Sequence, residues 1–214
     1  VVMATIAVNN EVITVIVIFS VESDRQQELI DAIAEFLETV KQQPGFVSAN
    51  LHQSIDGVKV ANYAQWQSQT DYNNFINNTE VQAKAAKLRE FNPPDIHVYE
   101  VVISESKEGT PKIKQGQYIT HFAEFRMPAE NQPHMIELAK ENVVKAMELP
   151  GLISANFHRS LDGTRVINYG QWLDRESIEN LKKQPGFGVK SEYWEGVAEN
   201  EHHLYEVVLT IPHD

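Results

Sequence analysis

The spacing of hydrophobic residues along the first half of the chain predicts a strand followed by a helix. Residues 12–21 form an almost continuous apolar and β-branched run, which is typical of a buried strand. Helical spacing follows in Leu29, Ile30, Ile33, Phe36, Leu37 and Val40. Ser23 or Asp24 can cap this helix, and Pro44-Gly45 ends it. The apolar stripe predicts a helix that packs on a sheet.

The following residues predict a hairpin, a weaker helix and a last strand. Asp56-Gly57 is a dipeptide preferred in two-residue type I′ turns, and strand-like runs flank it on both sides. A weaker helical pattern covers 70–90, and a strand is expected over 96–104. The predicted order of elements is β-α-β-β-α-β.

Segments of this half recur 106 positions later in the chain. The recurring pairs are 44–52 with 150–158, 62–66 with 168–172, and 99–102 with 205–208. The halves align without a gap over nearly their full length, so we expect one fold in two copies. Residues 104–117 between them are rich in Lys, Glu, Gly and Pro and predict a solvated linker. We therefore predict two domains, 1–110 and 111–214, with a boundary near Pro111.

This element order predicts an α+β fold. It is the ferredoxin-like arrangement, in which helices cover one face of an antiparallel sheet. The other face of so small a domain needs a partner, and a second copy on the same chain supplies one. We predict two ferredoxin-like repeats that form an intrachain pseudo-dimeric α+β barrel, and a further homodimer is left open.

The hairpin predicts which side chains share a face of the sheet. With the Asp-Gly dipeptide as the turn, Leu51 pairs with Asn62 and Val47 pairs with Trp66 on the apolar face beneath the helices. A buried amide needs a hydrogen-bond partner, since leaving it unpaired costs roughly 1 to 3 kcal/mol. Asn62 and its copy Asn168 are therefore either structural amides or ligand-binding groups. Trp66 and Trp172 are likewise either core residues or a surface for a ligand.

Two histidines fall on the opposite, polar face of the hairpin. His52 and His158 are predicted to point into the barrel between the two sheets, as a base or substrate contact, or as part of the interface between the repeats. The other histidines lack metal-ligand spacing, and the glycines lack the setting of a phosphate-binding loop. We expect neither a metal site nor a nucleotide cofactor.

Composition and charge exclude several classes of partner. Thirty acidic and eighteen basic residues give a formal charge of −12, which disfavours nucleic acid. The absence of cysteine fits a cytoplasmic protein. The opening apolar stretch, 1–8, is interrupted far short of the roughly 18 residues that a membrane span needs. We expect a leading strand or arm there and no membrane partner.

The run from Pro44-Gly45 through Asp56-Gly57 to Asn62-Tyr63-Ala64-Gln65-Trp66 resembles the antibiotic biosynthesis monooxygenase family, most of all its quinone-forming, anthrone-type members. The resemblance covers both halves. It implies oxygenation without metal, flavin or haem, with Asn and Trp in the pocket at positions 62 and 66 and again at 168 and 172. The family's pocket Tyr falls on Tyr72, whereas the second half has Ile178 there. The family's helical Arg has its nearest candidate in Arg89.

The resemblance implies that a small phenolic, anthrone-like or hydroquinone-like aromatic is oxidised by O2 to a quinone. A Tyr-dependent reaction would then run in the first half, unless Tyr193 or Trp194 substitutes in the second. The haem-degrading branch of the family ranks lower, because Ile76 and Lys182 stand where its proximal His would lie. A non-catalytic ligand-binding or stress-related barrel and an isomerase remain alternatives.

Overall fold

The computed structural model describes residues 4–183 and 192–212. The first repeat consists of β1 (Ile13–Ser20), α1 (Gln26–Val40), β2 (Phe46–Ser54), β3 (Lys59–Trp66), α2 (Gln69–Asn77), α3 (Thr79–Ala83) and β4 (Asp95–Ser106). The second consists of β5 (Ile119–Arg126), α4 (Gln132–Ala146), β6 (Leu152–Ser160), β7 (Arg165–Trp172), α5 (Arg175–Glu179) and β8 (Glu199–Ile211). Short 3-10 turns lie at Ser23–Arg25, Ala86–Glu90, Ala129–Asn131 and Asn180–Lys183.

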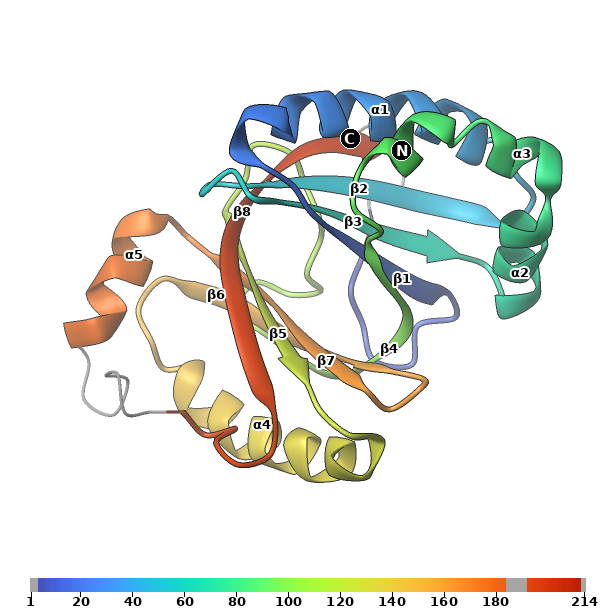
Figure 1. Ribbon diagram of the computed structural model, residues 1–214. Coiled ribbons are helices and arrows are strands. Elements are labelled where there is room, and N and C mark those ends of the chain that lie inside the picture. The colour runs from blue at the N-terminus through green and yellow to red at the C-terminus, as the bar shows by residue number, and fades with distance from the viewer. Residues whose placement is uncertain (1–3, 184–191, 213–214) are drawn as a thin grey trace.

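The eight strands form one closed antiparallel barrel in the order β1-β3-β2-β8-β5-β7-β6-β4 (Figure 1). The last strand of each repeat joins the two halves. β4 pairs with β1 through Tyr99 and then with β6 from Tyr99 to Ser106. β8 pairs with β5 through Tyr205 and with β2 from that residue onward. The predicted pseudo-dimeric α+β barrel is confirmed, and shared strands hold it closed.

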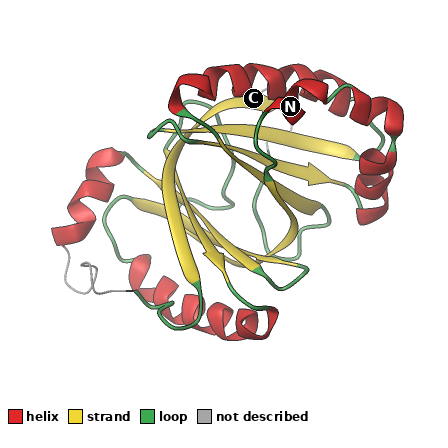
Figure 2. Ribbon diagram, in the orientation of Figure 1, coloured by secondary structure: helices red, strands yellow, loops and turns green. Residues whose placement is uncertain are grey.

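Helices cover the outside of the barrel on two opposite sides (Figure 2). The stripe of α1 that was predicted from its spacing packs on the outer face of β1, β2 and β3, where Leu29, Ile33 and Leu37 are buried. α4 packs in the same way on the second repeat, with Met135 and Ala139 fully buried. A third core fills the barrel itself. Each repeat therefore has an outer layer between helix and sheet, separate from the shared interior.

The hairpin turn differs from the predicted two-residue type I′ turn. That turn needs positive φ at both central residues, but only Gly57 adopts it, at +86°. Its backbone N–H donates to the carbonyl of Ser54 at 3.1 Å, and the loop spans residues 55–58. The pairing of Leu51 with Asn62 is as predicted, whereas a bulge brings Phe46 opposite Trp66 in place of Val47. The bulge shifts the register only at the start of β2.

Three other local predictions need correction. No side chain caps α1, because the 3-10 turn Ser23–Arg25 leads directly into it. The weak helix over 70–90 is divided, since Ser68 caps α2 and Asn78 caps α3. The expected linker begins as strand, because β4 continues to Ser106.

The opening arm is tied to the segment between the repeats. Thr5 forms a bridge with Lys112, and the backbone N–H of Ile6 donates to the carbonyl of Pro111 at 3.0 Å. Ile113 is buried there. Residues 1–3 lie outside the described residues, and the division into 1–110 and 111–214 stays a prediction. No helix within 4–183 or 192–212 is long and apolar enough to cross a membrane.

Candidate functional site

A cavity of about 500 Å³ lies in the second repeat, between the outer face of the sheet and the helices that cover it. All four strands of that repeat contribute to its floor, and α4, α5 and residues 192–194 form the rest. Its wall is mainly apolar. The lining residues are His121, Ala123, Phe125, Asn142, Val143, Ala146, Leu149, Leu152, Ala155, Phe157, Asn168, Gly170, Trp172, Ile178, Leu181, Glu192, Tyr193, Trp194, Asn200, His202 and Leu204.

Asn168 places an amide in the floor of this cavity. Its Oδ1 accepts the backbone N–H of Asn156 at 3.1 Å, so the side chain is held in one orientation by β6. Its Nδ2 donates to none of the described residues. Among the residues that the structure describes, the amide is thus bonded only through its oxygen, and its nitrogen can donate to a ligand in this mainly apolar cavity.

Aromatic side chains stand on two sides of the cavity. Trp172 is buried at the end of β7, and Tyr193 and Trp194 precede β8. The ring of Trp194 lies 5.4 Å from that of Phe125 and 5.0 Å from that of Tyr193, both edge to face. Burial raises the pKa of Tyr193, so its hydroxyl stays protonated. Such a wall suits a flat aromatic ligand.

A histidine pair is the least expected feature of the wall. Nε2 of His121 lies 3.2 Å from Nδ1 of His202, and both side chains line the cavity. Burial, and then the neighbouring His202 and His203, lower the pKa of His121 to about 4. Sequence reasoning missed this pair, although a signal existed: residues 106 positions earlier are Val15 and Ile96. Two apolar positions of one repeat thus carry imidazoles in the other.

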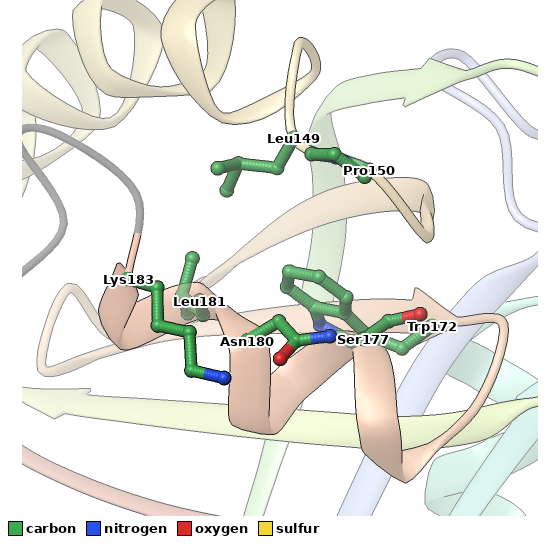
Figure 3. A pocket seen from close by; sticks show the side chains of 7 residues that line it. All are labelled: Leu149, Pro150, Trp172, Ser177, Asn180, Leu181 and Lys183. Atoms are coloured by element: carbon green, nitrogen blue, oxygen red, sulfur yellow. The ribbon is translucent and has the colours of Figure 1, made fainter.

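A smaller cavity of about 250 Å³ adjoins the first and shares Leu149, Trp172 and Leu181 with it. Figure 3 shows the indole of Trp172 beneath Leu149, with Asn180 and Lys183 at one side. Gly151 lets α5 approach this region, because a Cβ there would lie 2.2 Å from Oγ of Ser177. Trp172 therefore separates two connected spaces. No group of three His, Asp or Glu side chains among residues 4–183 and 192–212 is arranged to hold a metal ion.

The matching space in the first repeat contains larger side chains. Phe75 stacks on Trp66 with ring centroids 4.9 Å apart, and Tyr72 lies 5.9 Å from the same indole. Phe36 packs against Phe75 at 6.2 Å. At an offset of 106, the second repeat has Asn142, Ile178 and Leu181 in place of Phe36, Tyr72 and Phe75. Asn62 keeps the structural bond of its copy, accepting the N–H of Asn50 at 3.1 Å.

The structure therefore brings Asn168 and Trp172 together with Tyr193 and Trp194, and it places the other predicted site residues elsewhere. Tyr72 is buried in the first-repeat core, where burial raises its pKa and its hydroxyl meets no described hydrogen-bond partner. Arg89 is exposed and donates to the carbonyl of Gln82 at 2.8 Å. Their roles in substrate binding or catalysis stay predictions.

His52 and His158 point into the barrel, as predicted. Nε2 of His52 lies 2.7 Å from the hydroxyl of Tyr169, and Nε2 of His158 lies 2.7 Å from that of Tyr63. Each pair joins one repeat to the other. Burial lowers the pKa of both histidines to about 4, so they are neutral at neutral pH. Both histidines therefore lie at the interface between the repeats, which is one of the two alternatives that the sequence indicated. A contact with substrate stays a prediction.

The fold and site together define the class of protein: two ferredoxin-like domains that share one closed barrel, each with an Asn and a Trp beneath its helices. The family model described as antibiotic biosynthesis monooxygenase matches residues 12–87 and again 118–189. The chain belongs to the antibiotic biosynthesis monooxygenase family, with two tandem copies of its domain.

Individual relatives carry more specific names. Tetracenomycin-F1 monooxygenase of Streptomyces glaucescens is 42% identical over 71 residues, which are 33% of this chain and 63% of that relative, less than two thirds of its length. The crystal structure of an anthrone oxidase-like protein has a TM-score of 0.83 at 20% identity, with 97% of this chain and 95% of that chain covered. A candidate monooxygenase from Fusobacterium nucleatum has a TM-score of 0.63 at 14% identity, with 93% of each chain covered. The two structures share the fold.

Proposed function

We propose that the cavity of the second repeat is the active site of a cofactor-independent monooxygenase. Its substrate would be a small phenolic aromatic of the anthrone or hydroquinone type, oxidised by O2 to a quinone. The supporting observation is that this cavity of about 500 Å³ combines aromatic walls with the amide of Asn168, whose nitrogen donates to none of the described residues. The names of the tetracenomycin-F1 monooxygenase and of the anthrone oxidase-like protein fit the same class of aromatic substrate.

The substrate itself supplies the electrons in this proposal. An anthrone loses a proton to give an electron-rich anion, and O2 adds to its central ring carbon. Protonation of the peroxide gives a hydroperoxide; the remaining hydrogen on that carbon is then lost with hydroxide as water. A carbonyl is left, so one oxygen atom enters the product and the other leaves as water.

The protein contributes position, exclusion of water and hydrogen bonds. Trp172 and Trp194 hold the planar ring system, and the apolar wall lowers the dielectric constant around the anion. Nδ2 of Asn168 donates to the oxygen that becomes negative when O2 adds. A donor already fixed by the bond to the Asn156 backbone does not have to reorganise as the charge develops.

The reaction is placed in the second repeat because of the space available there. The first repeat has the complete Asn, Trp and Tyr set of the family, but Tyr72 and Phe75 pack on Trp66. We propose that Asn62 and Trp66 stabilise the first repeat and that Asn168 and Trp172 serve the reaction.

Oxygen uptake tests this function directly. Chelator-treated protein is mixed with a panel of anthrones and hydroquinones, autoxidation is subtracted, and the quinone product is quantified. We expect uptake that survives chelation and equals quinone formation mole for mole with an anthrone, and that falls in Asn168→Ala. Uptake no faster than autoxidation across the panel contradicts the proposal and favours a ligand-binding barrel or an isomerase.

A further inference from the structure

We propose that His121 and His202 form the base that removes the acidic proton of the substrate in the second-repeat cavity. This inference rests on the proposed function and names two further catalytic residues for it. It is carried by the geometry of the pair, by its place in a mainly apolar wall, and by the charges around it.

The two imidazoles lie on neighbouring strands of one sheet face. His202 of β8 pairs with Ala123 of β5, so it is the diagonal neighbour of His121 on the outer surface. The ring centroids are 5.2 Å apart, and the 3.2 Å between Nε2 of His121 and Nδ1 of His202 is a hydrogen-bond distance. One imidazole must donate its N–H and the other must accept it, so the pair is held together in its neutral form.

The pair leaves one ring nitrogen of each residue available to a ligand. Among residues 4–183 and 192–212, Nδ1 of His121 and Nε2 of His202 have no hydrogen-bond partner. The corresponding wall positions of the first repeat are Val15 and Ile96, so the fold itself does not require imidazoles here. His121 is partly exposed and His202 is exposed, so water reaches these two nitrogens and a ligand can replace it. A phenolic or enolic hydroxyl in the cavity is a suitable partner.

The surroundings of His121 keep its imidazole neutral at pH 7. His121 has its pKa lowered to about 4 by burial first and by His202 and His203 next. His203 faces the pair from the barrel side of β8, and the carboxylate of Glu192 lines the same cavity. The residues that α4 and β7 present there, such as Asn142 and Asn168, carry no charge. The neutral His121 therefore has a lone pair that can accept the substrate proton.

The proton balance of the reaction follows from this arrangement. One C–H bond at the central carbon of the anthrone, or the O–H bond of its enol, breaks; the proton moves to an imidazole nitrogen, and the electron pair stays on the substrate as the anion that reacts with O2. The imidazolium then returns its proton to the peroxide oxygen. The pair ends the cycle neutral, and the electrons that reduce O2 come from the substrate.

Matched glutamine variants test the pair. His121→Gln and His202→Gln keep a polar side chain, and His134→Gln, an exposed residue of α4, is the control. At pH 7 we expect kcat for 1,8-dihydroxyanthrone to fall about 100-fold in each cavity variant, with KM changed less than about 3-fold. Their rates should recover as pH rises and the substrate ionises in solution. The control should behave as the wild type, and melting temperatures should report folding.

An anaerobic titration separates this inference from the proposed function. Without O2, the absorbance of bound 1,8-dihydroxyanthrone should be that of the anion in the wild type and of the neutral form in the cavity variants. An anion band in the wild type and in both cavity variants, with one shared pH profile, would show that the two histidines are not the base. The proposed monooxygenase function would be unaffected. An anion band in the wild type alone, without later oxygen uptake, supports the base and refutes the monooxygenase. If chelation abolishes turnover and added metal restores it, the two histidines bind a metal ion, and the proposal is overturned. Absence of binding refutes both.

Discussion

The two repeats share the His–Tyr pairs of the barrel interior but differ in how the space beneath the outer helices is filled. Inside, His52 bonds to Tyr169 and His158 bonds to Tyr63 at the same 2.7 Å. Outside, the layer beneath α1 is filled by aromatic residues, whereas the layer beneath α4 contains a cavity of about 500 Å³. In the interior, each His–Tyr pair joins one repeat to the other. The outer layers are independent of each other, so one can become a site while the other remains a core.

The largest loss of stability should appear in the two tryptophans. Trp66 is 2% exposed, stacks on Phe75 and meets the edge of Phe46 at 5.7 Å. Trp66→Ala should lower the free energy of unfolding by about 3 to 5 kcal/mol. Trp172→Ala should cost about 1 to 2 kcal/mol less, since that indole already borders two cavities. Urea titrations measure both, and equal losses would contradict the comparison.

The two asparagines separate structural from catalytic loss. Asn62→Ala and Asn168→Ala each remove the same bond to a backbone N–H, at 3.1 Å in both repeats. Their stability losses should match. Only Asn168→Ala should lower kcat, by about 100-fold or about 2.7 kcal/mol, because it also removes the donor to the oxygenated intermediate. A similar loss of turnover in Asn62→Ala would place the reaction in the first repeat.

The shared interior should make the protein sensitive to acid. The buried His52 and His158 have pKa values lowered to about 4, against 6.5 when unfolded. The unfolded chain therefore binds more protons between pH 6.5 and 4, and stability is lost as pH falls through that window. Glu124, whose pKa is raised to about 6 by burial, acts in the opposite direction and offsets part of the loss.

From His52, His158 and Glu124 together we expect a net loss of about 3 kcal/mol between pH 7 and pH 4.5. Urea titrations at the two pH values measure it, and the double variant His52→Phe/His158→Phe should show a smaller loss. An unchanged pH dependence in the double variant would show that these histidines do not control acid sensitivity.

The smallest effect is expected at Tyr72. Its hydroxyl has no described partner, so Tyr72→Phe should change stability by less than about 0.5 kcal/mol and turnover by less than about 2-fold. Steady-state oxygen uptake measures this. A tenfold loss of turnover in this variant would instead support the Tyr-dependent reaction in the first repeat that the resemblance to the family implies.

The repeated sequence predicted most of the fold. The offset of 106, the apolar stripe of α1 and the pairing of Leu51 with Asn62 are confirmed, because each depends on periodicity that a strand or helix must obey. The turn type and the bulge at Val47 depend on backbone angles that a dipeptide alone does not determine. The continuation of β4 into the expected linker depends on β6, which the sequence does not place beside it.

The site was predicted less completely than the fold. Asn168 and Trp172 belong to a motif that repeats, and they could be singled out. The space around them depends on residues that do not repeat, such as Asn142 opposite Phe36 in the alignment. His121 and His202 are 81 positions apart and meet only because β5 pairs with β8. Positions where two copies differ in polarity are therefore as informative as positions where they agree.

Filling the cavity is the most direct test of the account. The triple variant Asn142→Phe/Ile178→Tyr/Leu181→Phe gives the second repeat the side chains that fill the first, and Asn142→Ala leaves the space open as a control. The account predicts that the filled variant folds but loses both 1,8-dihydroxyanthrone binding and oxygen uptake, whereas the control keeps them. Unchanged binding and uptake in the filled variant would show that the reaction takes place elsewhere in the molecule.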